Sequence, residues 1–395
     1  MIYKNYIGGE WVEAEGRETF RSVNPADTSD ILGEFPLSDE REVNRAVEAA
    51  DRAFQGWERV PAPRRGELLF KVAQELERRK EELARLLTRE MGKVLNEARG
   101  EVQEAIDMTY YIAGEGRRLR GYTTPSELPD KAQYAIRRPI GRIAMITPWN
   151  FPIAIPAWKL IPALVAGNTL VWKPATDTPK LAYELVKIME GQGLPPGVVN
   201  LVFGSGSKVG VPLAKHPKIE MITFTGSTEV GREIYRYGAE KLNKVHLEMG
   251  GKNPIIVLED ADLDLALEGI IWSAFGTTGQ RCTACSRLII EEGVYEELLK
   301  ELVKRTELLK LGNGLDEDVD LGPVVNEAQL NKIHEYVQLG LKEGAKLLCG
   351  GERATEGELA KGYFYKPTIF SEVKPEMRIA QEEIFGPVLS VLKAR

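Results

Sequence analysis

The sequence predicts an α/β protein with a doubly wound parallel sheet and a second α/β domain after it. Two observations lead to this fold class. Between Ile140 and Glu248, short apolar runs alternate with segments of helical length, which is typical of βαβ units that share one parallel sheet. In addition, a chain of 395 residues is too long for one ordinary core, so we expect about two or three domains.

The apolar runs between Ile140 and Glu248 have the length of strands. We expect these strands at residues 142–146, 169–172, 198–202, 221–224 and 245–247. Because helices of about ten to fifteen residues separate most of them, the region is predicted to be a Rossmann-like dinucleotide-binding domain. A second α/β portion begins near Gly250, where Asp262 is expected to cap a helix that runs through Ala274. Its other elements are expected at residues 254–258, 288–290, 295–309 and 327–341.

Residues 39–120 predict three helices that form a packing layer. The middle helix carries apolar residues at the spacing of one helical face, namely Leu69, Val72, Leu76, Leu83 and Leu86. The helical period is lost in residues 122–138, where Pro125 and Pro129 interrupt it. These changes predict a dinucleotide-binding domain at 1–121 and 139–249, a separate segment at 122–138, and a second domain at 250–395.

The composition excludes several classes of function. A formal net charge of −7 and a pI near 5.4 argue against nucleic acid or an acidic membrane as partner, because a polyanion would be repelled. The first ten residues have no apolar core of signal-peptide length, and no later run approaches a membrane span. Three cysteines cannot form a disulfide framework in a chain of this length. We therefore expect a cytoplasmic protein.

Cys282 is the candidate nucleophile, because it stands on a glycine-flanked turn next to Arg281, which could favour the thiolate. An ordinary buried thiol is the alternative. Cys282 and Cys285 also form a Cys-x-x-Cys spacing, so a redox pair or a metal site has to be considered. A structural zinc needs four ligands, and the chain has no second cysteine pair and only three histidines, so we expect no metal. A disulfide between Cys282 and Cys285 that silences the thiol under oxidation is a hypothesis.

Glu248 is the candidate general base. It precedes Gly250 and Gly251, where the backbone can approach a ligand closely. A thiolate that forms a thioester needs a second group to activate water and release the acyl product, so Cys282 and Glu248 are chemically complementary. The alternative is a solvated glutamate at the end of a strand.

Six motifs in this order along the chain resemble those of the aldehyde dehydrogenase family. They are Thr147-Pro148-Trp149-Asn150-Phe151-Pro152, Trp172-Lys173-Pro174, Phe224-Thr225-Gly226-Ser227-Thr228, His246-Leu247-Glu248-Met249-Gly250-Gly251-Lys252, the segment from Phe275 to Cys285, and Glu382-Glu383-Ile384-Phe385-Gly386-Pro387-Val388. The resemblance implies oxidation of an aldehyde to a carboxylic acid through a thiohemiacetal and a thioester at Cys282. Asn150 then has the oxyanion role, with the Cys282 backbone N–H, and Glu248 activates water. A glutamate at position 248 favours hydrolysis over transfer to coenzyme A.

The resemblance also implies a nicotinamide cofactor, NADP or NAD. Its predicted contacts are Thr147, Pro148, Trp149, Lys173, Thr176, Gly206, Gly226, Ser227, Gly251, Glu383 and Phe385. Gly226 and Ser227 begin a helix after a strand and could hold a phosphate at the helix N-terminus. NAD-preferring relatives often have a glutamate three residues after the lysine that matches Lys173, where it repels a 2′-phosphate. Here that residue is Thr176, so we predict that NADP is accepted.

The substrate and the assembly are further expectations from the resemblance. The motif Gly-Gln-Arg-Cys-Thr-Ala is similar to that of enzymes that oxidise semialdehydes such as 2-oxoglutarate semialdehyde. Residues 122–138 match the family's oligomerisation segment, so we expect a homo-oligomer. Family members continue well beyond the Glu-Ile-Phe-Gly-Pro-Val motif, whereas the sequence ends seven residues after Val388. We therefore expect the C-terminal part of the family pattern to be absent and the catalytic domain to be incomplete.

Two other readings remain open at this point. A shortened chain could be a catalytically silent protein that still binds a dinucleotide. In that case the dinucleotide binds but mixing with an aldehyde gives no burst of NAD(P)H. An esterase that uses the same thiol needs no cofactor, and it would hydrolyse esters in the absence of any dinucleotide.

Overall fold

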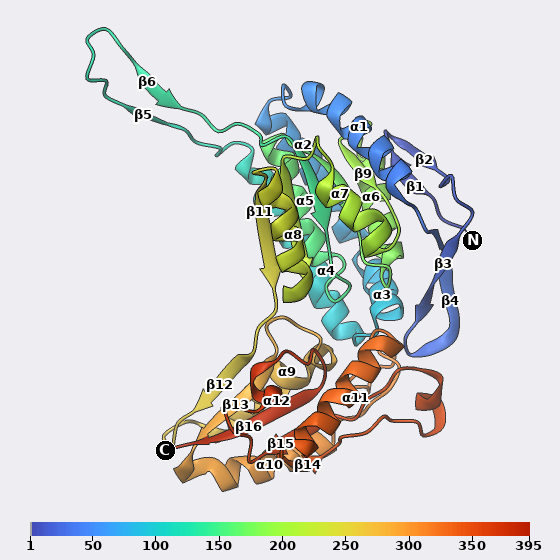
Figure 1. The fold of residues 1–395 in the computed structure, drawn as a ribbon, viewed down its shortest axis with the longest axis vertical. Coiled ribbons are helices and arrows are strands. Elements are labelled where there is room, and N and C mark those ends of the chain that lie inside the picture. The colour runs from blue at the N-terminus through green and yellow to red at the C-terminus, as the bar shows by residue number, and fades with distance from the viewer. Residues whose placement is uncertain (1) are drawn as a thin grey trace. The chain divides into compact units, whose positions relative to one another are not determined.

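The computed structural model describes residues 2–395 and divides the chain into two compact units (Figure 1). The first unit comprises the residues up to Ser22, Gly33–Leu83 and Gly100–Glu248, and the second comprises Val23–Leu32, Ala84–Arg99 and Met249–Arg395. The division after Glu248 falls within one residue of the predicted boundary. Two short earlier segments also belong to the second unit, which the sequence did not indicate.

The first unit is built on a seven-stranded sheet with the order β11-β10-β7-β8-β9-β1-β2. Its strands are β7 (Arg142–Ile146), β8 (Thr169–Lys173), β9 (Val199–Leu201), β10 (Met221–Gly226), β11 (Lys244–Met249), β1 (Asn5–Ile7) and β2 (Glu10–Val12). Strands β10, β7, β8 and β9 run parallel, whereas β1 pairs antiparallel with β9 and with β2. Chain order reverses at β7, as the predicted doubly wound sheet requires. All five predicted strands are present.

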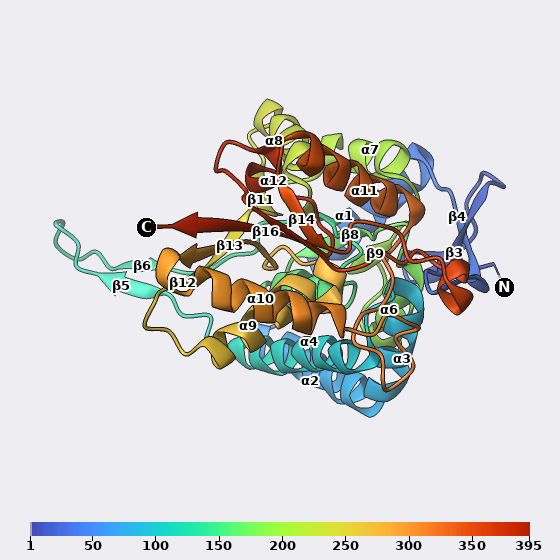
Figure 2. The same ribbon diagram turned by 90° about the horizontal axis from the view of Figure 1, so that it is seen from below.

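Helices cover both faces of this sheet because the central strands are apolar on both sides. One face packs against α1 (Glu40–Trp57), α7 (Val211–Lys215) and α8 (Thr228–Glu240), and this core contains Val43, Ile146, Leu213 and Ile222. On the other face lie α5 (Ala154–Ala166), α6 (Pro179–Gly191) and α2 (Ala62–Arg78). Helix α2 contacts α5 and α6. Figure 2 shows the same elements from below.

Residues 39–120 contain four helices and not the three expected. They are α1, α2, α3 (Lys80–Met91) and α4 (Leu95–Glu115). The predicted middle helix is broken at Arg79, whose backbone leaves the helical region (φ −98°, ψ 11°). The Arg79 guanidinium there bonds the carboxylates of Glu82 and Glu184. No glycine or proline marks this break, and the apolar spacing continues across it. The sequence therefore predicted one helix where the structure has two.

The second unit contains a five-stranded sheet with the order β12-β13-β16-β15-β14. Its strands are β12 (Asn253–Val257), β13 (Cys285–Glu291), β16 (Val388–Ala394), β15 (Thr368–Ser371) and β14 (Lys346–Cys349), and its main helices are α9 (Leu263–Phe275), α10 (Tyr295–Glu307), α11 (Glu327–Lys342) and α12 (Arg378–Gln381). The Asp262 side chain accepts a hydrogen bond from the Leu265 N–H, which confirms the predicted cap of α9. An additional ribbon, β3 (Thr19–Asn24) with β4 (Asp27–Pro36), was not predicted.

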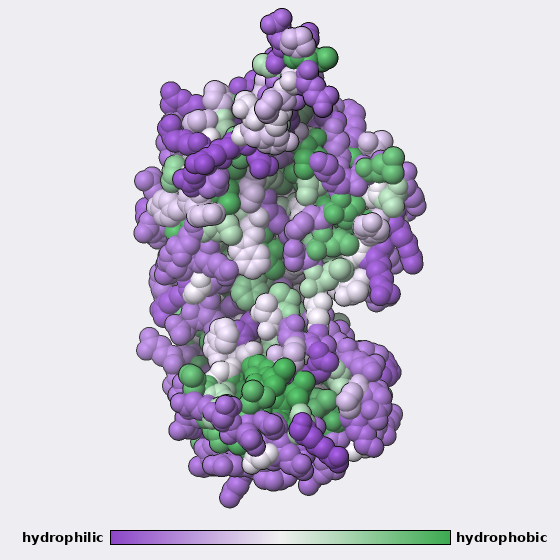
Figure 3. Space-filling view, turned by 90° about the vertical axis from the view of Figure 1, so that its left-hand side faces the viewer, coloured by the Kyte–Doolittle hydropathy of each residue, from purple (hydrophilic) through white to green (hydrophobic). Residues whose placement is uncertain are grey.

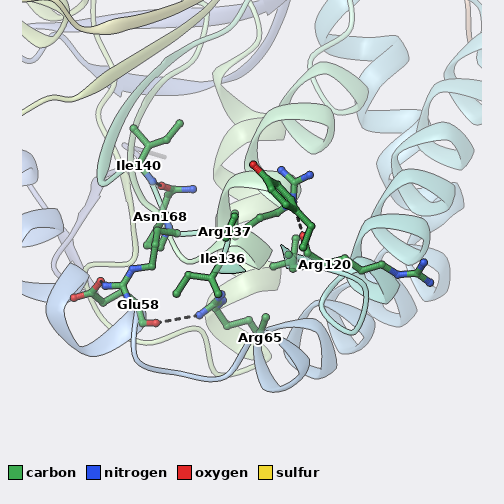
Figure 4. Close-up of a pocket in the computed structure, with 15 residues that line it drawn as sticks. Glu58, Arg65, Arg120, Ile136, Arg137, Ile140 and Asn168 are labelled. Atoms are coloured by element: carbon green, nitrogen blue, oxygen red, sulfur yellow. Dashed lines mark hydrogen bonds and ion pairs between the residues drawn. The ribbon is translucent and has the colours of Figure 1, made fainter. Parts of the chain in front are cut away.

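The segment at 122–138 forms an antiparallel hairpin of β5 (Tyr122–Thr124) and β6 (Gln133–Ala135) that projects from the first unit (Figure 1). A cleft of about 720 Å³ lies at its base. Figure 4 shows charged side chains around it, and the lining includes Glu58, Arg65, Arg120, Arg137 and Arg138. None of the predicted site residues lines this cleft. Within residues 2–395, no helix is long and apolar enough to cross a membrane.

Candidate active site

The predicted site residues of the first unit gather at the carboxyl ends of its strands. Residues 147–150 follow β7, Lys173 ends β8, Gly206 follows β9, Gly226 ends β10 and Glu248 lies near the end of β11. Because β7 to β10 are parallel, these ends share one edge of the sheet. The change in strand order falls between β7 and β10, which is the place where open α/β sheets bind their ligands.

The loop after β7 is fixed by buried hydrogen bonds. The Trp172 indole N–H donates to Thr147 Oγ1 over 2.9 Å, and the Thr147 N–H donates to the Lys173 carbonyl over 3.2 Å. Asn150 is buried and precedes α5. The first amides of α5, those of Ile153 and Ala154, donate to the Glu101 carboxylate. A carboxylate on the first free N–H groups of a helix satisfies donors that have no partner within the helix.

Lys173 is buried at the end of β8. Its ammonium donates to the Pro174 carbonyl over 2.5 Å, and burial lowers its pKa to about 8. A Cβ at Gly210 would lie 3.5 Å from the Lys173 side chain, so the turn of π-helix at Gly206–Gly210 lies beside it. The structure therefore brings Lys173 and the Gly206 turn together. Thr176 is half-buried three residues farther along the chain.

Gly226 and Ser227 form the turn into α8 as expected. A Cβ at Gly226 would lie 2.5 Å from the Phe224 ring, so a larger residue would displace that ring. Ser227 Oγ accepts from the Val230 N–H over 3.4 Å and caps α8.

Glu248 has neighbours that the sequence interpretation missed. Its Oε1 lies 3.3 Å from His246 Nε2, and both side chains are more than half exposed. His246 Nδ1 lies 3.5 Å from Thr223 Oγ1, which accepts from the Lys159 ammonium over 2.9 Å. Burial lowers the pKa of Lys159 to about 8, while the charge of Glu248 acts in the opposite direction. The alternation of side chains along β11 was the signal that could have paired residues 246 and 248.

In the second unit, Cys282 lies on a loop between α9 and β13. The residues before it, Thr277 and Thr278, have positive φ angles of 53° and 56°, which are costly for β-branched residues. The Glu97 carboxylate accepts from the Thr277 N–H and hydroxyl, and the Thr278 hydroxyl donates to the Gly322 carbonyl. Such a constrained loop, held by hydrogen bonds to partners far away in sequence, is typical of a functional site.

Three further side chains fix the Cys282 loop. Asn253 Nδ2 donates to the carbonyls of Cys282 and Ala284 over 2.7 and 3.1 Å. Gln280 Nε2 donates to the Thr277 and Pro323 carbonyls, and its Oε1 accepts from the Val325 N–H. The Arg281 guanidinium donates to the Trp272 and Ser273 carbonyls and stacks over the Trp272 ring. Arg281 therefore anchors the loop to the end of α9.

Cys285 and Cys349 are packing residues. Cys285 is buried in the core of the second unit, its Sγ donates to the Arg287 carbonyl, and burial raises its pKa to about 11. Cys349 is the last residue of β14, and burial raises its pKa to about 11 as well. The three cysteines form no disulfide within residues 2–395. The described part of the chain also contains no group of three metal-binding side chains.

The remaining predicted cofactor residues also meet in the second unit. A Cβ at Gly250 would lie 2.0 Å from Glu383 Oε1, and the Gly251 backbone hydrogen-bonds the Glu383 carboxyl. Burial raises the pKa of Glu383. Phe385 has a φ of 60°, and Gln329 Nε2 donates to its carbonyl over 2.9 Å. Gly251 and Glu383, which were predicted separately, are therefore direct neighbours.

Comparison with known proteins agrees with this arrangement. The aldehyde dehydrogenase family model matches residues 11–395. The alpha-ketoglutaric semialdehyde dehydrogenase of Bacillus subtilis is 46% identical over 391 residues, which are 99% of this chain and 80% of the relative. The crystal structure of betaine aldehyde dehydrogenase from Staphylococcus aureus with NAD⁺ has a TM-score of 0.98 and 34% identity, and the match covers 100% of this chain and 78% of that one. A structure of 3,6-anhydro-L-galactose dehydrogenase in complex with NADP has a TM-score of 0.97 and 37% identity, covering 100% and 82%.

The chain belongs to the aldehyde dehydrogenase family. It is an oxidoreductase that oxidises an aldehyde to a carboxylic acid with NAD or NADP. The catalytically silent alternative is not favoured. The family match reaches the last residue of the sequence, so the expectation that the C-terminal part of the family pattern is absent is not borne out.

Proposed function

We propose that Cys282 is the nucleophile, Glu248 the general base and Asn150 the oxyanion donor of this reaction. The observation that carries the proposal is the constrained loop that presents Cys282 after two threonines in left-handed conformations. Cys285 supports it by contrast, because burial raises its pKa and disfavours the reactive thiolate. In this proposal the first unit binds the dinucleotide and the second carries the nucleophile.

The proposed reaction has two stages. Cys282 Sγ forms a bond to the aldehyde carbon, and the Asn150 amide with the Cys282 N–H stabilises the resulting oxyanion. Bound NAD(P) would supply the acceptor for the hydride and its two electrons, and loss of this hydride would leave a thioester on Cys282. Glu248 then takes a proton from water as the water oxygen attacks the thioester carbon. The C–S bond breaks, the acid leaves and the Cys282 thiolate is restored.

The residues present fit a dinucleotide. An ammonium has three N–H donors, and Lys173 directs one of them to the Pro174 carbonyl, so the other donors can bond the hydroxyls of a ribose. Gly206 leaves open space around its Cα, which suits close approach of a ligand to the backbone. In the second unit, the half-buried carboxyl of Glu383 beside Gly251 offers acceptors for the other ribose.

We propose a semialdehyde that carries a carboxylate, such as 2-oxoglutarate semialdehyde, as substrate. The support is the likeness to the semialdehyde dehydrogenase of Bacillus subtilis. The test measures kcat/KM for 2-oxoglutarate semialdehyde, malonate semialdehyde and betaine aldehyde with both cofactors. We expect the first to be preferred and to give a burst of reduced cofactor. Preference for betaine aldehyde would contradict the proposed identity of the substrate. Ester hydrolysis with no cofactor-dependent oxidation would contradict the proposed reaction.

The neutral side chain of Thr176 is proposed to permit NADP. Replacing it (Thr176→Glu) places a carboxylate three residues after Lys173, where it would repel a 2′-phosphate and bond a 2′-hydroxyl. We expect kcat/KM for NADP to fall roughly 100-fold relative to that for NAD. The matched control Thr176→Gln has nearly the same size without the charge, and it should retain most NADP activity. A wild-type enzyme that strongly prefers NAD would contradict this role.

We propose that the protein forms a homo-oligomer through an apolar face of its second unit. Figure 3 shows apolar side chains gathered there. Three of its apolar side chains are each more than 60% exposed, namely Ile256 on β12 and Leu265 and Trp272 on α9. Strand β12 is an edge strand. Apolar patches of this kind mark interaction surfaces, and an uncovered edge strand favours pairing. The exposed hairpin tyrosines Tyr122 and Tyr134 offer a second contact.

A charge in this face is expected to weaken the assembly. In Leu265→Asp, a carboxylate would have to be buried without a partner at the interface, which is unfavourable. We therefore expect a smaller mass by light scattering and sedimentation at micromolar concentration. Leu308→Asp, at a leucine after α10 that is at least as exposed, is the control and should keep the wild-type mass. Equal masses for wild type and Leu265→Asp would rule out this face as the contact.

A cytoplasmic location is also proposed, because the proposed reaction requires a reduced Cys282. The three cysteines form no disulfide within the described residues, which suits a reducing compartment. Cell fractionation checks this location.

A further inference from the structure

We infer that His246 is a positioning residue for the general base, held by a chain of hydrogen bonds that begins at the buried Lys159. This inference rests on the proposed role of Glu248 and adds a residue to it. The chain runs from Lys159 on α5 to Thr223 on β10, then to His246 and Glu248 on β11, with separations of 2.9, 3.5 and 3.3 Å.

The strands place these side chains on one face of the sheet. Val245 and Leu247 of β11 pack against the core formed with α8. Because side chains alternate along a strand, His246 and Glu248 point to the opposite face. On β10, Thr223 lies between the core residues Ile222 and Phe224, so its side chain also points to the opposite face. Lys159 of α5 contacts Thr223 on this opposite face.

Lys159 determines which atoms donate and which accept along this series of hydrogen bonds. An ammonium donates hydrogen bonds and cannot accept them, so Thr223 Oγ1 must be the acceptor in their contact. The Thr223 hydroxyl hydrogen is then available for His246 Nδ1, which leaves the hydrogen of a neutral imidazole on Nε2. A protonated imidazole also carries a hydrogen on Nε2. In both states Nε2–H therefore donates to Glu248 Oε1.

This contact leaves the other carboxylate oxygen for water. Glu248 is more than half exposed, so its Oε2 can meet a water molecule while Oε1 is held. The contact with His246 fixes the rotation of the Glu248 side chain. A general base must lie within hydrogen-bond reach of the proton that it takes, and a misplacement of about 1 Å can cost 10²-fold in rate. His246 should therefore affect thioester hydrolysis and not the formation of the thioester.

The test compares the two stages in the full-length enzyme by stopped-flow and by intact mass of the quenched protein. We expect His246→Ala to give a full burst of reduced cofactor and then a steady-state rate that is roughly 10- to 100-fold lower, with acyl-enzyme accumulating. His246→Gln keeps an N–H donor at this position and should recover most of the rate. Lys244→Ala, on the same strand and face, is the control and should behave as wild type.

The outcomes separate this inference from the proposed function. A wild-type steady-state rate in His246→Ala, with Glu248→Gln still slow, overturns the role of His246 and leaves the general base intact. If burst and steady-state rate fall together, or if the melting temperature falls and His246→Gln does not recover the rate, His246 is a structural residue and the inference fails. A wild-type steady-state rate in Glu248→Gln itself overturns the proposed function on which the inference rests.

Discussion

Replacing Cys282 by serine should abolish the formation of reduced cofactor, with kcat/KM lower by roughly 10⁴-fold or more. Cys282 Sγ is proposed to make the bond that turns the aldehyde into a hydride donor, and a hydroxyl is a far weaker nucleophile at neutral pH. The loop should survive the change, because its hydrogen bonds come from Glu97, Gln280, Arg281 and Asn253. Stopped-flow absorbance of the reduced cofactor measures the effect.

The other two cysteines provide matched controls for this prediction. Cys285→Ala and Cys349→Ala remove thiols whose pKa is raised by burial, and both variants should keep the burst. Calorimetry establishes that each variant folds. If the burst disappears in Cys285→Ala and remains in Cys282→Ser, the assignment of the nucleophile is wrong.

Replacing Glu248 by glutamine should separate the two stages of the reaction. The burst of reduced cofactor should remain, because Cys282 and Asn150 are unchanged, while steady-state turnover should fall about 10²- to 10⁴-fold for want of a general base. The thioester should accumulate and appear in the mass of the quenched protein as an added acyl group. Comparison of burst amplitude with steady-state rate in one stopped-flow trace checks both statements.

A neighbouring carboxylate serves as the control for Glu248. Glu240→Gln, at the exposed end of α8, removes the same charge from the same βα unit and should turn over at the wild-type rate. Loss of the burst together with turnover in Glu248→Gln would mean that this residue acts before the thioester forms, and its role as the hydrolytic base would be wrong.

The parts of the fold that the sequence predicts are those with a strong local pattern. Strands β7 to β10 were found because parallel strands covered on both faces are short apolar runs between helices. Strands β1 and β2 are short antiparallel edge elements, and their few residues carry no comparable pattern. The break at Arg79 was missed because no glycine or proline stands there, and one of the ion pairs that Arg79 makes at this point is with the distant Glu184.

The candidate site shows the same division between local and distant causes. Residue type, local motif and the family resemblance together indicated Cys282, Glu248 and Gly226. The positive φ of Thr277 could not be predicted, because a β-branched residue disfavours that conformation and it is held by Glu97, which is far away in sequence. The partnership of Glu248 with Lys159 likewise depends on a neighbouring strand and a helix.

The interleaving of the two units constrains how the chain can fold as it is made. Residues 23–32 and 84–99 belong to the unit whose other members begin at Met249. During synthesis these early segments leave the ribosome well before residues 249–395 exist, so their contacts with those residues form only after the later part of the chain has been made. Their pairing closes loops of more than a hundred residues, and such non-local contacts slow folding. Helices α3 and α4 each contain residues of both units, so cutting the chain after Glu248 would leave the C-terminal fragment without residues 23–32 and 84–99, which belong to its unit.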